Sequence, residues 1–223
     1  MQIDDRIAQL LCSRLCHDLA GPAGAVNTGM ELIGEAENPI SPENAQTMDF
    51  VMHSARQVTD RLAFYRLAFG FAGRGGAPRV AVADACRLIE SFIDRSRIDV
   101  RWDCPDGDLT SDQIRMVFTM ILMALGCLPR GGRLLCGFGT IEDGFGVAMT
   151  ASGEGARLSD DDRAALDMNV PVDRLSARNV HVRWGALVAA NMGGAIEIDG
   201  PAEGAFLAKE NAEVRLAVLL IGS

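Results

Sequence analysis

Residues 41–69, SPENAQTMDFVMHSARQVTDRLAFYRLAF, predict a long amphipathic helix. Ser41 followed by Pro42 is a typical helix start, because serine caps the first turn and proline fits the first helical position. Apolar residues then recur at intervals that alternate between three and four, at Met48, Val51, Ala55, Val58, Leu62, Tyr65 and Phe69. This spacing is the heptad pattern of a helical bundle.

A second helical pattern precedes this one. Its apolar stripe consists of Ile7, Leu11, Leu15, Leu19, Val26, Met30 and Ile33. Pro22 occupies the missing place in the stripe, and the linker over residues 34–40 is short, so we expect the two helices to fold back as an antiparallel hairpin. One hairpin offers too few partners for two such stripes. We therefore expect a homodimer in which two hairpins form a four-helix bundle.

A glycine-rich segment at residues 70–78 predicts a hinge, after which short helices and strands alternate. We expect helices near residues 84–95, 111–128 (capped by Ser111 or Asp112) and 182–191, and strands near residues 98–103, 133–137, 144–150, 195–198 and 214–221. Residues 151–180 predict a loop with one short helix. The predicted fold class is α+β, with a helical hairpin in residues 1–72 and a two-layer α/β sandwich in residues 78–223.

Composition excludes several classes of protein. Of the 223 residues, 48% are hydrophobic and 23% are charged, values typical of a globular protein that exclude a disordered or fibrous chain. The formal net charge is -9, and nucleic acid requires a positive surface, so we do not expect DNA or RNA as a partner.

The beginning of the chain is polar and acidic, so no secretory signal is expected. No apolar run reaches the roughly 18 residues that a membrane-spanning helix needs without a polar break. We therefore expect a cytoplasmic protein that does not bind membranes. Thiols stay reduced in that compartment, and we expect most of the cysteines to be small core residues. The six cysteines are Cys12, Cys16, Cys86, Cys104, Cys127 and Cys136.

Residues 11–22, LCSRLCHDLAGP, contain the candidate functional site. At about 100° per residue, His17 lies about 160° from the leucines two positions before and after it, so we expect its imidazole to point into solvent. Asp18 follows directly. Pro22 has no amide hydrogen, so it leaves the Asp18 carbonyl without its helical partner and bends the helix.

The face of the helix around His17 carries mostly small side chains. Its members are Ser13, Arg14, Ala20, Gly21 and Gly24. Small residues around an exposed imidazole leave room for another protein to approach. Arg14 lies one turn before the histidine and is a candidate contact to a transferred phosphoryl group.

This stretch resembles the H-box of two-component phosphotransfer proteins, in which an acid follows the histidine and a proline lies four residues further on. With Asn27 and then Glu31 and Leu32 following it, the chain is similar to alphaproteobacterial histidine phosphotransferases of the ChpT family along its whole length. Most of the specificity of this resemblance lies in the first forty residues.

The resemblance implies a phosphorelay protein, an enzyme with a phosphohistidine intermediate. His17 takes a phosphoryl group from the receiver domain of a hybrid histidine kinase and passes it to receiver aspartates of response regulators. Asp18 orients the imidazole or takes its proton. The resemblance also implies that the chain itself binds no cofactor, because the receiver supplies Mg²⁺.

The second module resembles a histidine-kinase ATPase domain that has lost its chemistry. Residues 118–125, followed by residues 129–132, are similar to the N-box helix of those domains. Met123 stands where the N-box carries the asparagine that holds Mg²⁺, and Ala151 stands where the adenine-binding aspartate is expected. Methionine cannot ligate a cation that requires oxygen donors, and alanine accepts no hydrogen bond. We therefore expect neither ATP nor a metal ion to bind.

Two other functions stay open at this point. One is an ATP-using histidine kinase core, which Met123 and Ala151 disfavour. The other is a non-catalytic scaffold that docks receivers, which the intact pair of His17 and Asp18 disfavours.

Covalent haem is disfavoured by the three residues between Cys12 and Cys16, one more than that motif has. Zinc is disfavoured because the histidine points about 100° away from the cysteines.

Two further histidines have no assigned role. His53 lies off the heptad positions, and we expect it to be solvated. His181 is expected in a loop. The acidic run at residues 160–162 predicts the start of a helix rather than a metal site.

Overall fold

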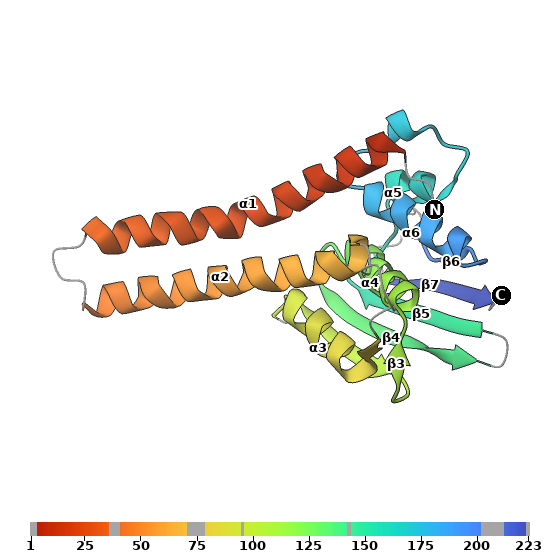
Figure 1. The fold of residues 1–223 in the computed structure, drawn as a ribbon, viewed down its shortest axis with the longest axis horizontal. Helices are drawn as coiled ribbons and strands as arrows, with labels where there is room; N and C mark the ends of the chain where they lie inside the picture. Colours follow the sequence, from red (N-terminus) through yellow and green to blue (C-terminus); the bar gives the residue numbers. More distant parts are fainter. Residues whose placement is uncertain are drawn as a thin grey trace.

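The computed structural model describes residues 4–35, 41–70, 79–94, 96–141, 144–201 and 212–221. A long helical hairpin extends away from a module in which helices pack against a mixed sheet (Figure 1). This is the predicted α+β fold class. Apart from its first residue, the expected hinge at residues 70–78 lies outside the described residues.

The hairpin consists of α1 (Asp5–Glu35) and α2 (Pro42–Phe69), which lie side by side (Figure 1). Ser41 is the N-cap of α2, as predicted, and its Oγ accepts a hydrogen bond from the Asn44 amide at 3.2 Å. Pro42 follows at the start of the helix, where its missing amide hydrogen costs nothing. The predicted hairpin is therefore confirmed.

The heptad pattern of α2 is only partly buried within one chain. Val51 and Tyr65 are buried, but Met48 and Leu62 are 39% and 50% exposed. Ala55 is exposed as well. Alternate members of the pattern thus face in different directions, and one set is only partly covered by the described residues. Met30, which we expected in the apolar stripe of α1, is also exposed.

The second module is built on a five-stranded sheet with the strand order β2-β4-β5-β7-β6. The strands are β2 (Ile98–Asp103), β4 (Gly132–Ile141), β5 (Gly144–Gly153), β6 (Ile196–Asp199) and β7 (Ala212–Ile221). The pair β2 and β4 is parallel and the other pairs are antiparallel. A separate small sheet pairs β1 (Val80–Ala81) with β3 (Asp108–Leu109).

The helices of this module are α3 (Val82–Phe92), α4 (Ser111–Gly126), α5 (Asp160–Leu166) and α6 (Val180–Asn191), with a short 3-10 helix, η1 (Val172–Arg174), between the last two. The N-cap of α4 is Thr110, which forms a capping box with Gln113, and not Ser111 or Asp112 as expected. Thr110 is the preferred cap because its side chain accepts from the Gln113 amide while the Gln113 side chain accepts from the Thr110 amide. The acidic run at residues 160–162 begins α5, as predicted.

Helix α4 packs against α2, α6 and the sheet, and for this reason it is apolar around almost its whole circumference. At the base of the hairpin the Phe64 ring of α2 stacks on Phe92 of α3, with 3.9 Å between ring centroids. Nearby, Trp184 of α6 donates a hydrogen bond from Nε1 to the Ala68 carbonyl at 2.8 Å. These contacts anchor the C-terminal half of α2 to the α/β module.

The cysteines do not all lie in the core. Cys127 and Cys136 are buried, but Cys12 and Cys16 are exposed on α1. The expectation was wrong for these two because each lies one position beyond a leucine of the apolar stripe, which turns it away from the covered side. All six thiols are free. Among the described residues, no helix is long and apolar enough to cross a membrane.

Candidate functional site

His17 lies on the exposed side of α1, and its side chain is 86% accessible to solvent. This agrees with the orientation expected from the helical pattern. The imidazole Nδ1 lies 3.1 Å from Oδ1 of Asp18, the next residue along the helix. The other ring nitrogen, Nε2, has no protein partner among the described residues.

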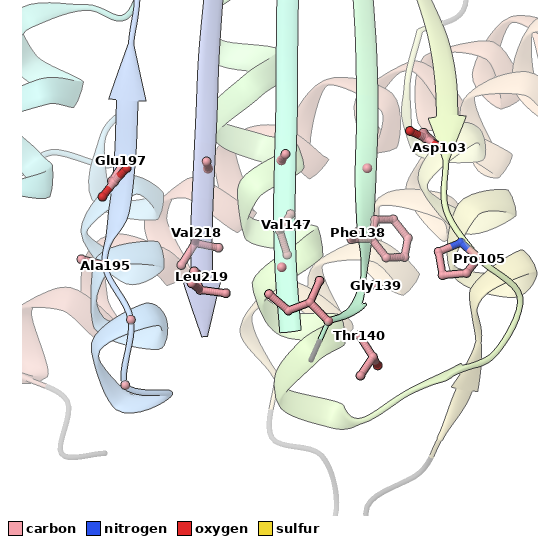
Figure 2. A pocket seen from close by; sticks show the side chains of 17 residues that line it. Asp103, Pro105, Phe138, Gly139, Thr140, Val147, Ala195, Glu197, Val218 and Leu219 are labelled. Atoms are coloured by element: carbon pink, nitrogen blue, oxygen red, sulfur yellow. The ribbon is translucent and has the colours of Figure 1, made fainter. Parts of the chain in front are cut away.

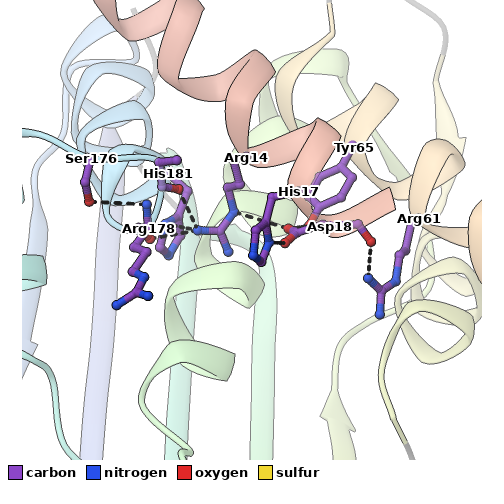
Figure 3. A network of polar contacts seen from close by, with 9 residues as sticks. Arg14, His17, Asp18, Arg61, Tyr65, Ser176, Arg178 and His181 are labelled. Carbon is purple, nitrogen blue, oxygen red and sulfur yellow. Dashed lines mark hydrogen bonds and ion pairs between the residues drawn. The ribbon is translucent and has the colours of Figure 1, made fainter. Parts of the chain in front are cut away.

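The two carboxylate oxygens of Asp18 contact different partners (Figure 3). Oδ1 faces the His17 ring, whereas Oδ2 accepts a hydrogen bond from the Tyr65 hydroxyl. The Arg14 Nε lies 3.7 Å from the same Oδ2. Burial, and then the hydrogen bond to the Asp18 carboxylate, raise the pKa of Tyr65 above its ordinary value, so the phenol remains a hydrogen-bond donor.

The backbone carbonyl of Asp18 also has a partner. Pro22 has no amide hydrogen to offer it, and the Arg61 guanidinium of α2 donates a hydrogen bond to it instead. Asp18 is therefore held through both its side chain and its main chain. Sequence patterns did not single out Arg61 or the hydroxyl of Tyr65 for the site.

Arg14 points toward the α/β module (Figure 3). Its Nη1 donates a hydrogen bond to the Arg178 carbonyl at 2.7 Å and lies 2.9 Å from Nδ1 of His181. His181 is in the first turn of α6 and is 4% exposed, and not in a loop as expected. Burial, and then the nearby Arg14 charge, hold the pKa of His181 well below its usual range. The imidazole is therefore neutral, and its Nδ1 accepts the hydrogen bond from Arg14.

These contacts give Arg14 a role that the sequence did not suggest, as a link between the hairpin and the second module. Its predicted contact with a phosphoryl group stays a prediction. The sequence does contain one sign that His181 is buried, because it lies between Val180 and Val182. That run was too short to separate a helix start from a loop.

The small residues predicted around His17 are at the surface. Ser13, Ala20, Gly21 and Gly24 are all exposed. A Cβ atom placed on Gly21 or Gly24 would meet nothing within 4 Å. The helix surface beside the imidazole therefore has no large side chains that would block the approach of another protein.

The two positions at which the sequence resemblance predicts lost nucleotide-binding residues lie inside the α/β module. Met123 and Ala151 are both fully buried. Helix α6 packs closely on α4 at this point, since a Cβ on Gly185 would lie 3.1 Å from the Met123 sulfur. Within the described ranges, no group of three or more histidine, cysteine, aspartate or glutamate side chains has an arrangement suited to a metal ion.

An open hollow of about 850 Å³ lies on the sheet of the second module (Figure 2). Its lining residues come from the sheet, the segment after β2 and the turn before β6, and none belongs to α1 or α2. Its lining includes glycines of β4 and β5, and Asp103 and Glu197 lie at its two sides. The hollow is therefore separate from the His17 site.

Residues 82–204 match the family described as the histidine phosphotransferase C-terminal domain. The chain belongs to the histidine phosphotransferase family. It is 29% identical over 197 residues to the protein phosphotransferase ChpT of Brucella abortus (strain 2308), a match that covers 88% of this chain and 91% of that protein. A solved structure of a bacterial phosphotransferase superposes with a TM-score of 0.78 at 24% identity, covering 98% of each chain. The family match and the relative therefore identify the chain as a phosphotransferase, and the solved structure shows that it has the same fold.

Proposed function

We propose that this phosphotransferase carries a phosphoryl group on His17 in a phosphorelay. The group arrives from the receiver domain of a hybrid histidine kinase and leaves for receiver aspartates of response regulators. The observation that carries the proposal is an exposed imidazole whose Nδ1 is held by the Asp18 carboxylate at 3.1 Å while Nε2 faces solvent.

The hydrogen bond to Asp18 selects the reactive nitrogen. A neutral imidazole carries one proton, and a carboxylate beside Nδ1 favours the tautomer with the proton on that nitrogen. Nε2 then keeps its lone pair and is the nucleophile. The tautomer also accounts for the exposed position of His17, because the lone pair has to reach another protein.

In the proposed transfer, the Nε2 lone pair attacks the phosphorus of the donor's aspartyl phosphate. The N–P bond forms while the bond from phosphorus to the aspartate oxygen breaks, and the carboxylate stays on the donor. The ring gains positive charge in this step, and the Asp18 carboxylate offsets it at the Nδ1 proton. The same steps in reverse deliver the group to the aspartate of the acceptor.

We propose that the receiver docks over the surface of small residues beside His17, formed by Ser13, Ala20, Gly21 and Gly24. These residues are exposed, and the two glycines have open space around them. The receiver supplies Mg²⁺ in this proposal, and the chain binds no cofactor of its own.

We also propose that ATP does not bind. Met123 and Ala151 are buried and offer neither an oxygen ligand for Mg²⁺ nor an acceptor for an adenine amino group. In this proposal residues 1–72 form the dimerisation and phosphotransfer unit and residues 78–223 an ATPase-like unit without ATPase chemistry. The site of action is the cytoplasm.

The proposed functional unit is a homodimer. Met48, Met52 and Leu62 lie along one side of α2 at helical spacing and are each at least 39% exposed. A soluble helix that leaves such a stripe in water gains stability by covering it. Because these residues belong to the heptad side of α2 or border it, a second hairpin covers them in a four-helix bundle.

Two parallel labelling reactions test the proposal. One contains the protein with radiolabelled ATP and Mg²⁺, and the other contains it with a pre-phosphorylated receiver from a hybrid kinase. Acid-labile label on the protein is expected only in the second reaction and is expected to disappear in His17→Ala. Label from ATP would indicate a kinase core. No label from any receiver that binds the protein would indicate a docking scaffold.

The role of Asp18 is tested in the same assay with Asp18→Asn, which keeps the shape of the side chain but removes its charge. Transfer is expected to slow by about a hundredfold or more, as for other losses of a positioned acid or base. Receiver binding is expected to persist. Transfer at the wild-type rate would remove Asp18 from the mechanism.

A further inference from the structure

The single tyrosine of the chain lies beneath the His17 site. Tyr65 is 4% exposed on α2, and its hydroxyl donates a hydrogen bond to Oδ2 of Asp18. The opposite oxygen of the same carboxylate contacts His17 Nδ1. A continuous chain of hydrogen bonds therefore leads from a buried phenol to the exposed imidazole.

The phenol ring is fixed by other rings. Phe69 stacks on it with 5.4 Å between centroids and an interplanar angle of 12°. Phe64 and Phe92 meet it edge to face, at 5.9 Å and 5.6 Å. These rings come from two different helices, α2 and α3. The hydroxyl consequently has a defined position and is a rigid donor.

The Asp18 side chain needs such a donor. His17 and Asp18 are adjacent on a helix, so their side chains diverge by about 100° and do not face each other by default. The carboxylate is 23% exposed and can rotate toward water. Arg14 Nε lies 3.7 Å from Oδ2, too far to hold it by a hydrogen bond. A hydrogen bond from Tyr65 to Oδ2 leaves Oδ1 directed at His17 Nδ1.

We propose that Tyr65 is a positioning residue for phosphotransfer, which holds the Asp18 carboxylate in the orientation that keeps the proton on His17 Nδ1 and the lone pair on Nε2. The inference rests on the proposed function, because it concerns the chemistry of the same histidine. It adds a role for the second module, since α3 supplies one of the rings that fix the phenol.

The test is Tyr65→Phe, which removes the hydroxyl and keeps the ring. The rate of transfer from a saturating phosphorylated receiver is expected to fall about tenfold to a hundredfold, the usual result of losing a hydrogen bond to a charged group. The affinity for the receiver is expected to stay unchanged. Thr59→Val, which removes an exposed hydroxyl from the same helix, is the matched control and is expected to transfer at the wild-type rate.

Nitrogen NMR of the His17 ring separates positioning from a general loss of structure. Wild-type protein is expected to show the tautomer protonated at Nδ1, and Tyr65→Phe is expected to show a larger share of the tautomer protonated at Nε2. In the Asp18→Asn background, Tyr65→Phe is expected to cause no further loss of rate, because the carboxylate that it positions is gone.

Wild-type transfer and an unchanged tautomer in Tyr65→Phe would overturn the inference, while loss of label in His17→Ala would leave the proposed function standing. If Tyr65→Phe does not fold, replacing the single tyrosine by fluorotyrosine keeps the ring and its hydroxyl. The fluorine resonance is then expected to move in Asp18→Asn and on phosphorylation of His17. A resonance that moves in neither case would also overturn the inference.

Discussion

Arg61 donates a hydrogen bond from its guanidinium to the backbone carbonyl of Asp18. In an uninterrupted helix the amide of residue 22 would donate to that carbonyl, but Pro22 has no amide hydrogen. The other helix of the hairpin therefore supplies the donor that the proline removes. The bond joins α1 and α2 at the level of the proposed phosphotransfer residue.

This relationship predicts a coupling between positions 61 and 22. Arg61→Met is expected to lower the free energy of unfolding by about 1 kcal/mol, because the partly buried Asp18 carbonyl loses its donor. In a Pro22→Ala background the same substitution is expected to cost less, since the new backbone amide at position 22 bonds that carbonyl. Urea unfolding of the four proteins of this cycle measures the coupling. Equal costs in the two backgrounds would contradict it.

Local patterns were sufficient to predict the hairpin and the exposed histidine. The heptad spacing after Ser41, the cap itself and the outward direction of His17 all depend on residues within a few turns of one helix. The structure confirms each of these features. The five strands of the main sheet were also predicted near their observed places, because alternating runs bounded by glycines are local signals. The two-residue strands β1 and β3 were not predicted, since so short a run carries no alternation.

The contacts that complete the site were beyond such patterns. The Tyr65 hydroxyl and Asp18 are 47 residues apart, and Arg14 and His181 are 167 residues apart. A heptad position identifies Tyr65 as apolar and inward, but its polar end is satisfied by another helix. Periodicity shows which side of an element is covered, and it does not show which distant element covers it. For the same reason it did not show that only alternate heptad residues are buried within one chain.

The two glycines Gly24 and Gly29 on α1 are expected to respond oppositely to alanine. Gly24 is exposed with open space around it, so Gly24→Ala is expected to stabilise the protein by about 1 kcal/mol through helix propensity. At Gly29 a Cβ would lie 2.4 Å from Cγ2 of Val51, a stiff side chain. Gly29→Ala is expected to destabilise by about 1–3 kcal/mol despite the gain in propensity. Thermal unfolding of both variants checks the signs, and stabilisation by Gly29→Ala would show that the helices separate there at little cost.

His181 predicts a dependence of stability on pH. Its pKa in the folded protein lies well below 6.5 because of burial and the Arg14 charge, whereas the unfolded chain binds a proton near pH 6.5. Below that pH the unfolded state holds more protons, so stability is complete above pH 6.5 and falls as the pH is lowered. The loss between pH 7 and pH 5 is expected to reach up to about 2 kcal/mol.

The measurement is urea unfolding at both pH values for three proteins. His181→Asn keeps an acceptor for Arg14 and removes the titrating ring, so its loss of stability over this range is expected to be smaller than that of the wild type. His53→Asn removes an exposed histidine and is the control. It is expected to lose as much stability between pH 7 and pH 5 as the wild type. An equal loss in His181→Asn would assign the pH dependence to other groups.

The exposed stripe of α2 predicts the oligomeric state. Leu62 is 50% exposed and belongs to the heptad pattern, so Leu62→Glu is expected to place a charge in the proposed bundle and convert a dimer to a monomer. The fold is expected to survive, because the side chain has little cover within its own chain. Leu219→Glu is the matched control, since Leu219 is 49% exposed on the sheet of the other module. Light scattering on the two variants is expected to give a monomer and a dimer. A wild-type chain that is monomeric, or a dimer that persists in Leu62→Glu, would place the interface elsewhere or remove it.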